Sequence, residues 1–126
     1  MPNPNIKDFN GLFRDYARVD MTNVGQLNAQ GVTNNIVAKS GAYTATNADD
    51  AIACTASSAY QITLPQGAAY AGKIFAVVKD AGANVITVAG ASGTIGGAAS
   101  VSLAANAVHG VTVQSDGTNY WILSQY

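Results

Sequence analysis

The sequence contains no glutamate, so all seven of its acidic residues are aspartates. Only 10% of its residues are charged, against roughly 25% in an average soluble domain. Glutamate favours helices, whereas valine and threonine, which are frequent here, favour strands. Six basic residues and a net charge of −1 leave little to neutralise phosphates. The composition therefore favours β-structure and argues against nucleic acid as a partner.

Cysteine and histidine each occur once, as Cys54 and His109. A single cysteine cannot form an internal disulfide, and no Cys and His residues have the spacing of metal ligands. We expect Cys54, within the apolar run AIACTA, to be a buried structural thiol, and we assign His109 no role. No apolar run is long enough for a signal peptide or a membrane span. The chain is therefore expected to be made in a cytoplasm and to have no membrane as a partner.

The few charges are concentrated near the N-terminus. Six of the thirteen charged side chains (six basic, seven acidic) lie in the first twenty residues, whereas Asp116 is the only one between residues 81 and 126. A monomer with so neutral a surface would be poorly soluble. Two explanations remain open. Either serine, threonine, asparagine and glutamine form the wet surface, or much of the surface is buried between subunits.

Residues 1–40 differ from the rest in charge and pattern, and we interpret them as an N-terminal arm and linker. Four apolar residues are spaced to line one face of a helix for about two turns: Ile6, Phe9, Phe13 and Tyr16. Gly11 interrupts the pattern, and so short a helix needs a partner to be stable. Three interpretations remain open: a short helix that caps the sheet domain, a docking or oligomerisation helix, and an extended arm whose aromatic residues fill pockets of a partner.

Residues 41–126 alternate between short apolar runs and small turns. This spacing is typical of an all-β sandwich or barrel, here a small antiparallel one of about eight short strands. Val111 and Val113 are expected to face inward, and the run KIFAVV, apolar on both faces, is expected to be covered on both sides. The turn DAGANV is interpreted as a hairpin between the strands on either side of it.

No pattern in the sequence indicates catalysis. The glycine-rich stretch GASGTIGGA has neither dinucleotide-binding nor P-loop spacing, and no nucleophile elbow of the form G-x-S-x-G occurs. Asp49 and Asp50 are adjacent, so in a strand their carboxylates would point to opposite faces and would not converge on one proton or metal. The sequence therefore predicts a protein that is not an enzyme and uses no cofactor.

Aromatic residues near the C-terminus are the remaining candidates for binding. Tyr120, Trp121 and Tyr126 follow a strong turn dipeptide, Asp116-Gly117. Flat rings with a polar group can stack on sugars, which would make these residues a glycan site. The other interpretation is that Trp121 packs in the core or in a subunit interface, with one of the two tyrosines at its edge.

The order of signals from about Ala42 to Tyr126 resembles the small β-domain of bacteriophage decoration, head-fibre and tail-fibre proteins. The resemblance rests on the strand segments YTATNADDAIACTASSAYQITLP and IFAVVKDAGANVITVAG, the turn QGAAYAGK, the segment GTIGGAASVSLAA and above all the closing QSDGTNYW. It covers about two thirds of the chain and depends on pattern and turn chemistry.

Such domains are typically trimeric and non-catalytic, so the resemblance implies a virion structural protein that forms a homotrimer. Because the sequence has no shaft repeat, the favoured role is a capsid decoration (cement) or head-fibre protein. Its arm would bind the major capsid protein through Ile6, Phe9, Phe13 and Tyr16. The alternative is a tail-fibre or baseplate component that binds a host surface receptor or glycan.

Overall fold

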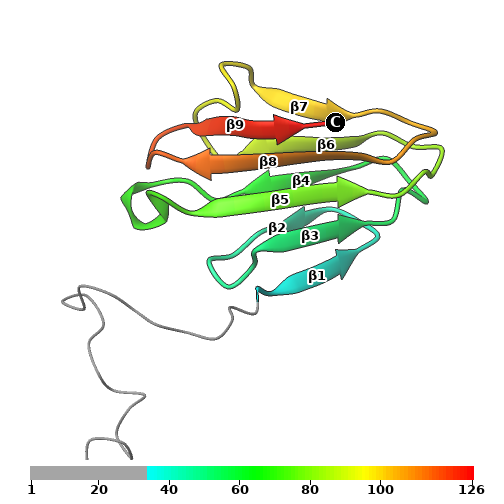
Figure 1. The fold of residues 1–126 in the computed structure, drawn as a ribbon, viewed down its shortest axis with the longest axis horizontal. Helices are drawn as coiled ribbons and strands as arrows, with labels where there is room; N and C mark the ends of the chain where they lie inside the picture. The colour runs from blue at the N-terminus through cyan, green and yellow to red at the C-terminus, as the bar shows by residue number, and fades with distance from the viewer. Residues whose placement is uncertain (1–33) are drawn as a thin grey trace, which may run out of the picture. The chain divides into compact units, whose positions relative to one another are not determined.

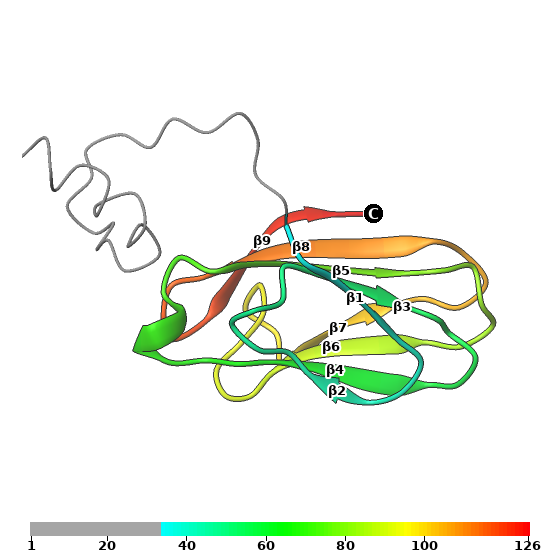
Figure 2. The same ribbon diagram turned by 90° about the horizontal axis from the view of Figure 1, so that it is seen from below.

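The computed structural model describes residues 34–126, and its regular structure is almost entirely β-strand (Figure 1). The strands form two sheets that face each other, as the view in Figure 2 shows. The all-β fold class predicted from the sequence is therefore confirmed. The arm predicted from Ile6, Phe9, Phe13 and Tyr16 lies outside the described residues, so its conformation stays a prediction.

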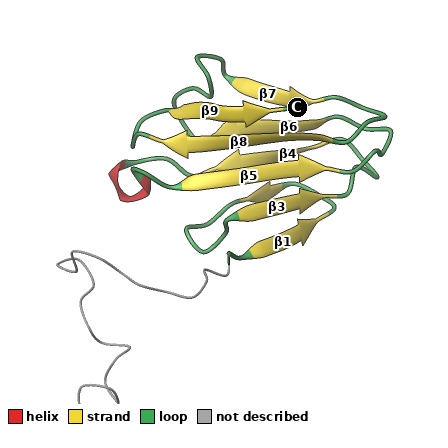
Figure 3. Cartoon of the chain, in the orientation of Figure 1, coloured by secondary structure: helices red, strands yellow, loops and turns green. Residues whose placement is uncertain are grey.

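Each sheet takes strands from the whole length of the described region (Figure 3). The five-stranded sheet has the order β1 (Ile36–Lys39), β3 (Ala51–Cys54), β5 (Ile74–Lys79), β8 (His109–Ser115) and β9 (Tyr120–Gln125). The four-stranded sheet has the order β2 (Tyr43–Thr44), β4 (Tyr60–Leu64), β6 (Ile86–Gly90) and β7 (Ser100–Leu103). One 3₁₀ turn, η3 (Ala68–Tyr70), precedes β5. The first strand thus lies within the segment that the sequence assigns to the arm and linker.

Both sheets are mixed, so the prediction of an antiparallel sandwich is wrong. β1, β3 and β5 pair in parallel, as do β2, β4 and β6, whereas β7, β8 and β9 join their sheets in antiparallel pairs. The reason is that, as far as β6, the chain crosses to the opposite sheet after every strand. Each strand therefore returns to its own sheet running in the same direction. A parallel connection needs a long crossover, usually a helix, and here a strand of the other sheet makes that crossover.

The turn DAGANV connects β5 to β6, but these strands lie in different sheets, so the predicted hairpin is also wrong. Oδ1 of Asp80 accepts hydrogen bonds of 3.0 Å from the backbone N–H groups of Ala56 and Gly82. Beside it, the ammonium group of Lys79 donates to the carbonyl oxygens of Asp80, Gly82 and Ala107, at 2.7, 3.2 and 2.9 Å. Lys79 is only 1% exposed. Three charged hydrogen bonds therefore join the loops at this end of the sandwich.

The core lies between the sheets and is built from alternate residues of each strand. Val111 and Val113 are 2% and 0% exposed, which confirms that they face inward. The largest core rings are Phe75 and Tyr120, whose centroids lie 6.2 Å apart at an angle of 59°, a tilted arrangement that aromatic pairs favour. The Tyr120 hydroxyl donates a hydrogen bond to the carbonyl of Pro65. One phenol thus ties the last strand to the end of β4.

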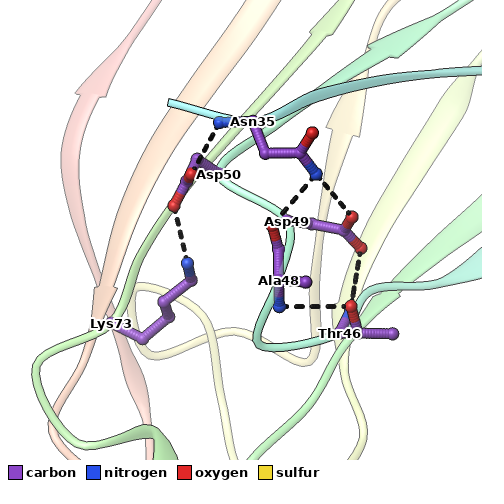
Figure 4. A network of polar contacts seen from close by, with 6 residues as sticks. All are labelled: Asn35, Thr46, Ala48, Asp49, Asp50 and Lys73. Carbon is purple, nitrogen blue, oxygen red and sulfur yellow. Dashed lines mark hydrogen bonds and ion pairs between the residues drawn. The ribbon is translucent and has the colours of Figure 1, made fainter. Parts of the chain in front are cut away.

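A buried carboxylate organises the loop between β2 and β3. Asp49, which is 3% exposed, accepts hydrogen bonds from the Tyr43 hydroxyl at 2.6 Å and from the Thr46 backbone N–H at 2.9 Å. Burial alone would raise the pKa of Asp49, but these hydrogen bonds outweigh it and hold the pKa below the ordinary value of 3.8. The side chain of Asn35 reaches the same carboxylate at 3.5 Å, so the loop is tied to the start of β1 (Figure 4).

Candidate interaction surface

The outer face of the four-stranded sheet is polar. Strand alternation and register place mainly hydroxyl and amide side chains there, at Thr44, Gln61, Thr63, Thr87, Ala89, Ser100 and Ser102. We call this surface the hydroxyl face. It matches the first explanation offered for the scarcity of charge, because short polar side chains form a wet surface without formal charges.

The outer face of the five-stranded sheet is very different, because it is uncharged and mostly apolar. We call it the apolar face and define it by the outward positions of its strands: Ile36, Ala38, Ala51, Ala53, Ile74, Ala76, Val78, Gly110, Thr112, Gln114, Trp121, Ser124 and Tyr126. Ile36, Trp121 and Tyr126 are 65%, 63% and 65% exposed. Exposed apolar side chains gathered on one face of a sheet are typical of interaction surfaces.

Trp121 stands out from the apolar face at β9, held by the turn before it. Oδ1 of Asp116 accepts hydrogen bonds from the backbone N–H groups of Thr118 and Asn119, at 2.8 and 2.7 Å. Its Oδ2 accepts a hydrogen bond of 2.9 Å from Nε1 of Trp121. The hydrogen bond from Asn119, followed by that from Trp121, lowers the pKa of Asp116 below its ordinary value. The indole is therefore exposed but fixed in orientation.

Tyr126 covers a strand position that has no side chain of its own. The backbones of Gly110 and Tyr126 exchange hydrogen bonds of 3.1 and 3.0 Å. A Cβ atom on Gly110 would lie 2.8 Å from Cζ of the Tyr126 ring, so the ring occupies that space. Nδ1 of His109 also makes a hydrogen bond of 2.9 Å with the backbone oxygen of Tyr126. This contact, which the sequence did not indicate, holds the last residue against β8.

Two other predicted residues belong to the interior. Tyr120 is 1% exposed, and burial raises its pKa to about 12. It therefore serves the core and is not a surface on which a glycan could stack. Its neighbour Trp121 faces outward because successive strand residues point to opposite faces. Cys54 is 4% exposed, and burial raises the pKa of its thiol, which confirms the expected structural thiol.

A hollow of about 420 Å³ opens on the apolar face at the starts of β3 and β5. Its lining comprises Asn34, Asp50, Ala51, Gly72, Lys73, Ile74 and Ala76. At its rim Nζ of Lys73 donates to Oδ1 of Asp50 at 2.7 Å (Figure 4), and this contact, the largest cause, lowers the pKa of Asp50. Asp50 thus points to the hollow while Asp49 points to the loop, which confirms that the two carboxylates diverge.

A second depression, a groove of about 460 Å³, lies beside Trp121. It is lined by Thr94, Gly96, Gly97, Asn119, Tyr120, Trp121 and Ile122. Oδ1 of Asn119 accepts hydrogen bonds from the backbone N–H and the hydroxyl of Thr94, at 2.9 and 3.1 Å. The groove therefore combines one exposed aromatic ring with a few polar groups, a combination that suits a small polar ligand.

Comparison with known proteins found no family model, no curated protein and no solved structure that matches the chain. Within residues 34–126, no group of three or more His, Cys, Asp or Glu side chains is placed to hold a metal ion. In the same region no helix is long and apolar enough to cross a membrane.

Proposed function

We propose that the chain is a non-catalytic structural protein of a bacteriophage virion, a homotrimeric capsid decoration or head-fibre protein. The apolar face is the observation that supports this proposal, because large exposed apolar patches are typical of surfaces through which proteins associate. The hydroxyl face on the other sheet would then face solvent on the assembled particle.

The polar groups buried in the described domain act in its own fold. Asp49 holds a loop, Lys79 joins the β5–β6 loop to the β7–β8 loop, and Ser115 accepts a hydrogen bond of 3.0 Å from the backbone N–H of Gly117 in the turn before β9. These buried polar groups are satisfied by contacts within the domain. This supports a structural role.

Anchoring is assigned to the arm. Ile6, Phe9, Phe13 and Tyr16 would bury their side chains against the major capsid protein, with a gain of roughly 25 cal/mol for each Å² of apolar surface. The costs of ordering the arm reduce that gain. Three arms on one trimer would bind together, so that a weak contact for each arm adds up to firm attachment. Trimers that link neighbouring capsid subunits would strengthen the shell.

The decisive test is the copy number and position of the protein in purified virions, measured by quantitative mass spectrometry and cryo-electron microscopy. We expect hundreds of copies spread over the head. A handful of copies at the tail would contradict the decoration role. In a second test, Phe9→Ala combined with Phe13→Ala should abolish binding to heads that lack the protein, whereas the control Thr87→Ala on the hydroxyl face should bind normally.

Both variants should unfold at the same temperature as the wild type. If Phe9→Ala with Phe13→Ala instead unfolds the β-domain, these residues belong to its core and the anchoring role is wrong. That result would leave the location on the virion to be decided by the copy number alone.

The groove beside Trp121 favours a second candidate, a tail-fibre or baseplate component that binds a host surface glycan. An exposed indole next to the polar groups of Asn119 and Thr94 is suited to stacking on a sugar. This role predicts that purified protein adsorbs to host cells, that soluble surface polysaccharide quenches the tryptophan fluorescence, and that Trp121→Ala abolishes both effects. Adsorption that persists in Trp121→Ala would contradict it.

A further inference from the structure

We propose that the apolar face is the surface through which copies of this chain associate, with Trp121 of one copy seated in the hollow at the starts of β3 and β5 of the next. The proposal deepens the homotrimer part of the proposed function and rests on it for the number of subunits. It is based on the sizes and charges of the outward side chains of the five-stranded sheet and on the register of its strands.

The apolar face is uneven in size from one edge to the other. Its two large aromatic side chains lie at one edge, Trp121 on the edge strand β9 and Tyr126 directly after it, and both are more than half exposed. At the opposite edge, Ile36 of β1 is exposed to a similar degree. Towards the opposite edge the outward residues of β3 are Ala51 and Ala53, and Ala76 lies beside them on β5. The face therefore has an aromatic projection at the β9 edge and a low floor of alanines over β3 and β5, which Ile36 borders at the β1 edge.

The hollow lies on that floor and is of a size to receive one aromatic side chain. Its volume of about 420 Å³ falls in the range of about 300–1,000 Å³ that binding pockets occupy. Ala51, Ile74 and Ala76 form its apolar part. At its rim the ammonium group of Lys73 is already neutralised by Asp50, so an indole can approach without leaving a charge unpaired.

The projection and the hollow stand at the same height along the strands. Ile74 pairs with Gln114, and Gln114 pairs with Trp121, so these residues form one row across β5, β8 and β9. A rotation axis parallel to the strands brings β9 of one copy over β3 and β5 of the next without any shift along the strands. Because the contact involves no shift along the axis, it can repeat around that axis and forms a closed ring when the rotation from one copy to the next is a whole fraction of a turn.

The outward strand positions of this face carry no formal charge, and the two charges at the hollow, Lys73 and Asp50, pair with each other, which favours a second copy over a charged foreign partner. A charged partner would be met by side chains of opposite sign, whereas the outward positions of the sheet are apolar or neutral. Because the face has both a projecting aromatic ring and a hollow and has no unpaired formal charge at its outward positions, it is complementary to a second copy of itself. Association through it would bury most of the exposed apolar surface on this side of the domain.

The test uses the full chain, whose only tryptophan is Trp121. Sedimentation should show assembly in the micromolar range, and tryptophan emission should shift to shorter wavelength as concentration rises and the indole is buried.

Trp121→Ala should weaken association by about 30-fold or more, the effect of losing a hot-spot residue. Trp121→Phe should restore most of it. Ala76→Arg, which fills the hollow with a charge, should abolish it, whereas Thr87→Arg on the hydroxyl face should not.

Three results would overturn the proposal. One is a protein that stays monomeric, another is an assembly that Trp121→Ala and Ala76→Arg leave intact, and the third is a monomer whose emission is already shifted at every dilution. The last would mean that residues 1–33 of the same chain cover the face. Circular dichroism of each variant separates loss of association from loss of folding. A dimer that dissociates in Ala76→Arg would support this interface while contradicting the trimer, and the copy number in virions tests the proposed function separately.

Discussion

Nε1 of Trp121 donates a hydrogen bond of 2.9 Å to Oδ2 of Asp116, five residues earlier in the chain. The same carboxylate accepts two backbone hydrogen bonds within the turn. One aspartate therefore forms the β8–β9 turn and orients the exposed indole. The motif QSDGTNYW contains both residues, and its aspartate accepts the hydrogen bonds of the turn as well as that of the tryptophan.

Asp116→Asn and Asp116→Ala should separate these two roles. An asparagine keeps one oxygen for the N–H groups of the turn but replaces the oxygen that Trp121 contacts with an NH₂ group, which cannot accept a hydrogen bond. We therefore expect Asp116→Asn to keep most of its melting temperature and to lower the fluorescence anisotropy of the indole. Asp116→Ala should lower both. An unchanged anisotropy in Asp116→Asn would show that neighbouring side chains, not the carboxylate, hold the ring.

Alternation along a strand predicts that Tyr120 and Trp121 point to opposite faces of the sheet, but it does not predict which of the two points outward. The sequence requires Tyr120 and Trp121 to point to opposite faces, yet both are large aromatic residues that could fill a core. The choice depends on the register of β9 against β8, which contains a bulge between Thr112 and Val113, and on Phe75 and Pro65, which receive Tyr120. These are contacts between distant parts of the chain, and the pattern of one segment cannot reveal them.

The same limit explains the errors in topology. Val111 and Val113 are buried as their alternation predicts, because alternation depends only on neighbouring residues. Whether two successive strands pair with each other or cross between sheets is decided elsewhere. The turn after β5 is short and rich in small residues, as in a hairpin, but Lys79 and Asp80 bind loops of other strands there. The parallel pairing therefore could not be predicted from the spacing of turns.

Gly110 and Tyr126 should show a marked coupling in stability. A methyl group on Gly110 would meet the ring of Tyr126 at 2.8 Å, so Gly110→Ala should destabilise the domain by about 1 kcal/mol as the ring is displaced. In a Tyr126→Ala background the space is free, and the same substitution should cost nothing or stabilise the strand. Chemical denaturation of the four proteins measures the coupling. Additive effects would mean that the ring does not rest on Gly110 in solution.

Lys79→Met should destabilise the domain by on the order of 3 kcal/mol, because it removes a buried charged donor from three backbone carbonyls. Lys73→Met is the matched control, since Lys73 makes its ion pair at the rim of the hollow, where solvent screens it. We expect a clearly smaller loss for the control. Urea unfolding at neutral pH measures both. Equal losses of unfolding free energy in the two variants would show that the buried hydrogen bonds of Lys79 contribute no more to stability than the ion pair of Lys73.

Stability should fall in acid. The pKa values of the four aspartates in the described region, Asp49, Asp50, Asp80 and Asp116, are all lowered in the folded protein from an ordinary value of 3.8. A carboxyl group with a lower pKa when folded binds its proton more readily in the unfolded chain. It therefore contributes stability above the ordinary value and loses that contribution as the pH falls through the folded value.

Asp49→Asn should flatten this acid dependence, because it removes the most buried of the four carboxylates. At neutral pH the variant should be less stable than the wild type, since the amide presents one acceptor oxygen where the carboxylate presents two to Tyr43, Thr46 and Asn35. As the pH falls below the ordinary carboxyl value, the difference between the two proteins should shrink, because the wild type then carries a neutral carboxyl group too. Melting temperatures recorded across that range provide the measurement. A difference that stays constant with pH would mean that the charge of Asp49 does not contribute to stability, and that the shape of the loop alone holds β2 to β3.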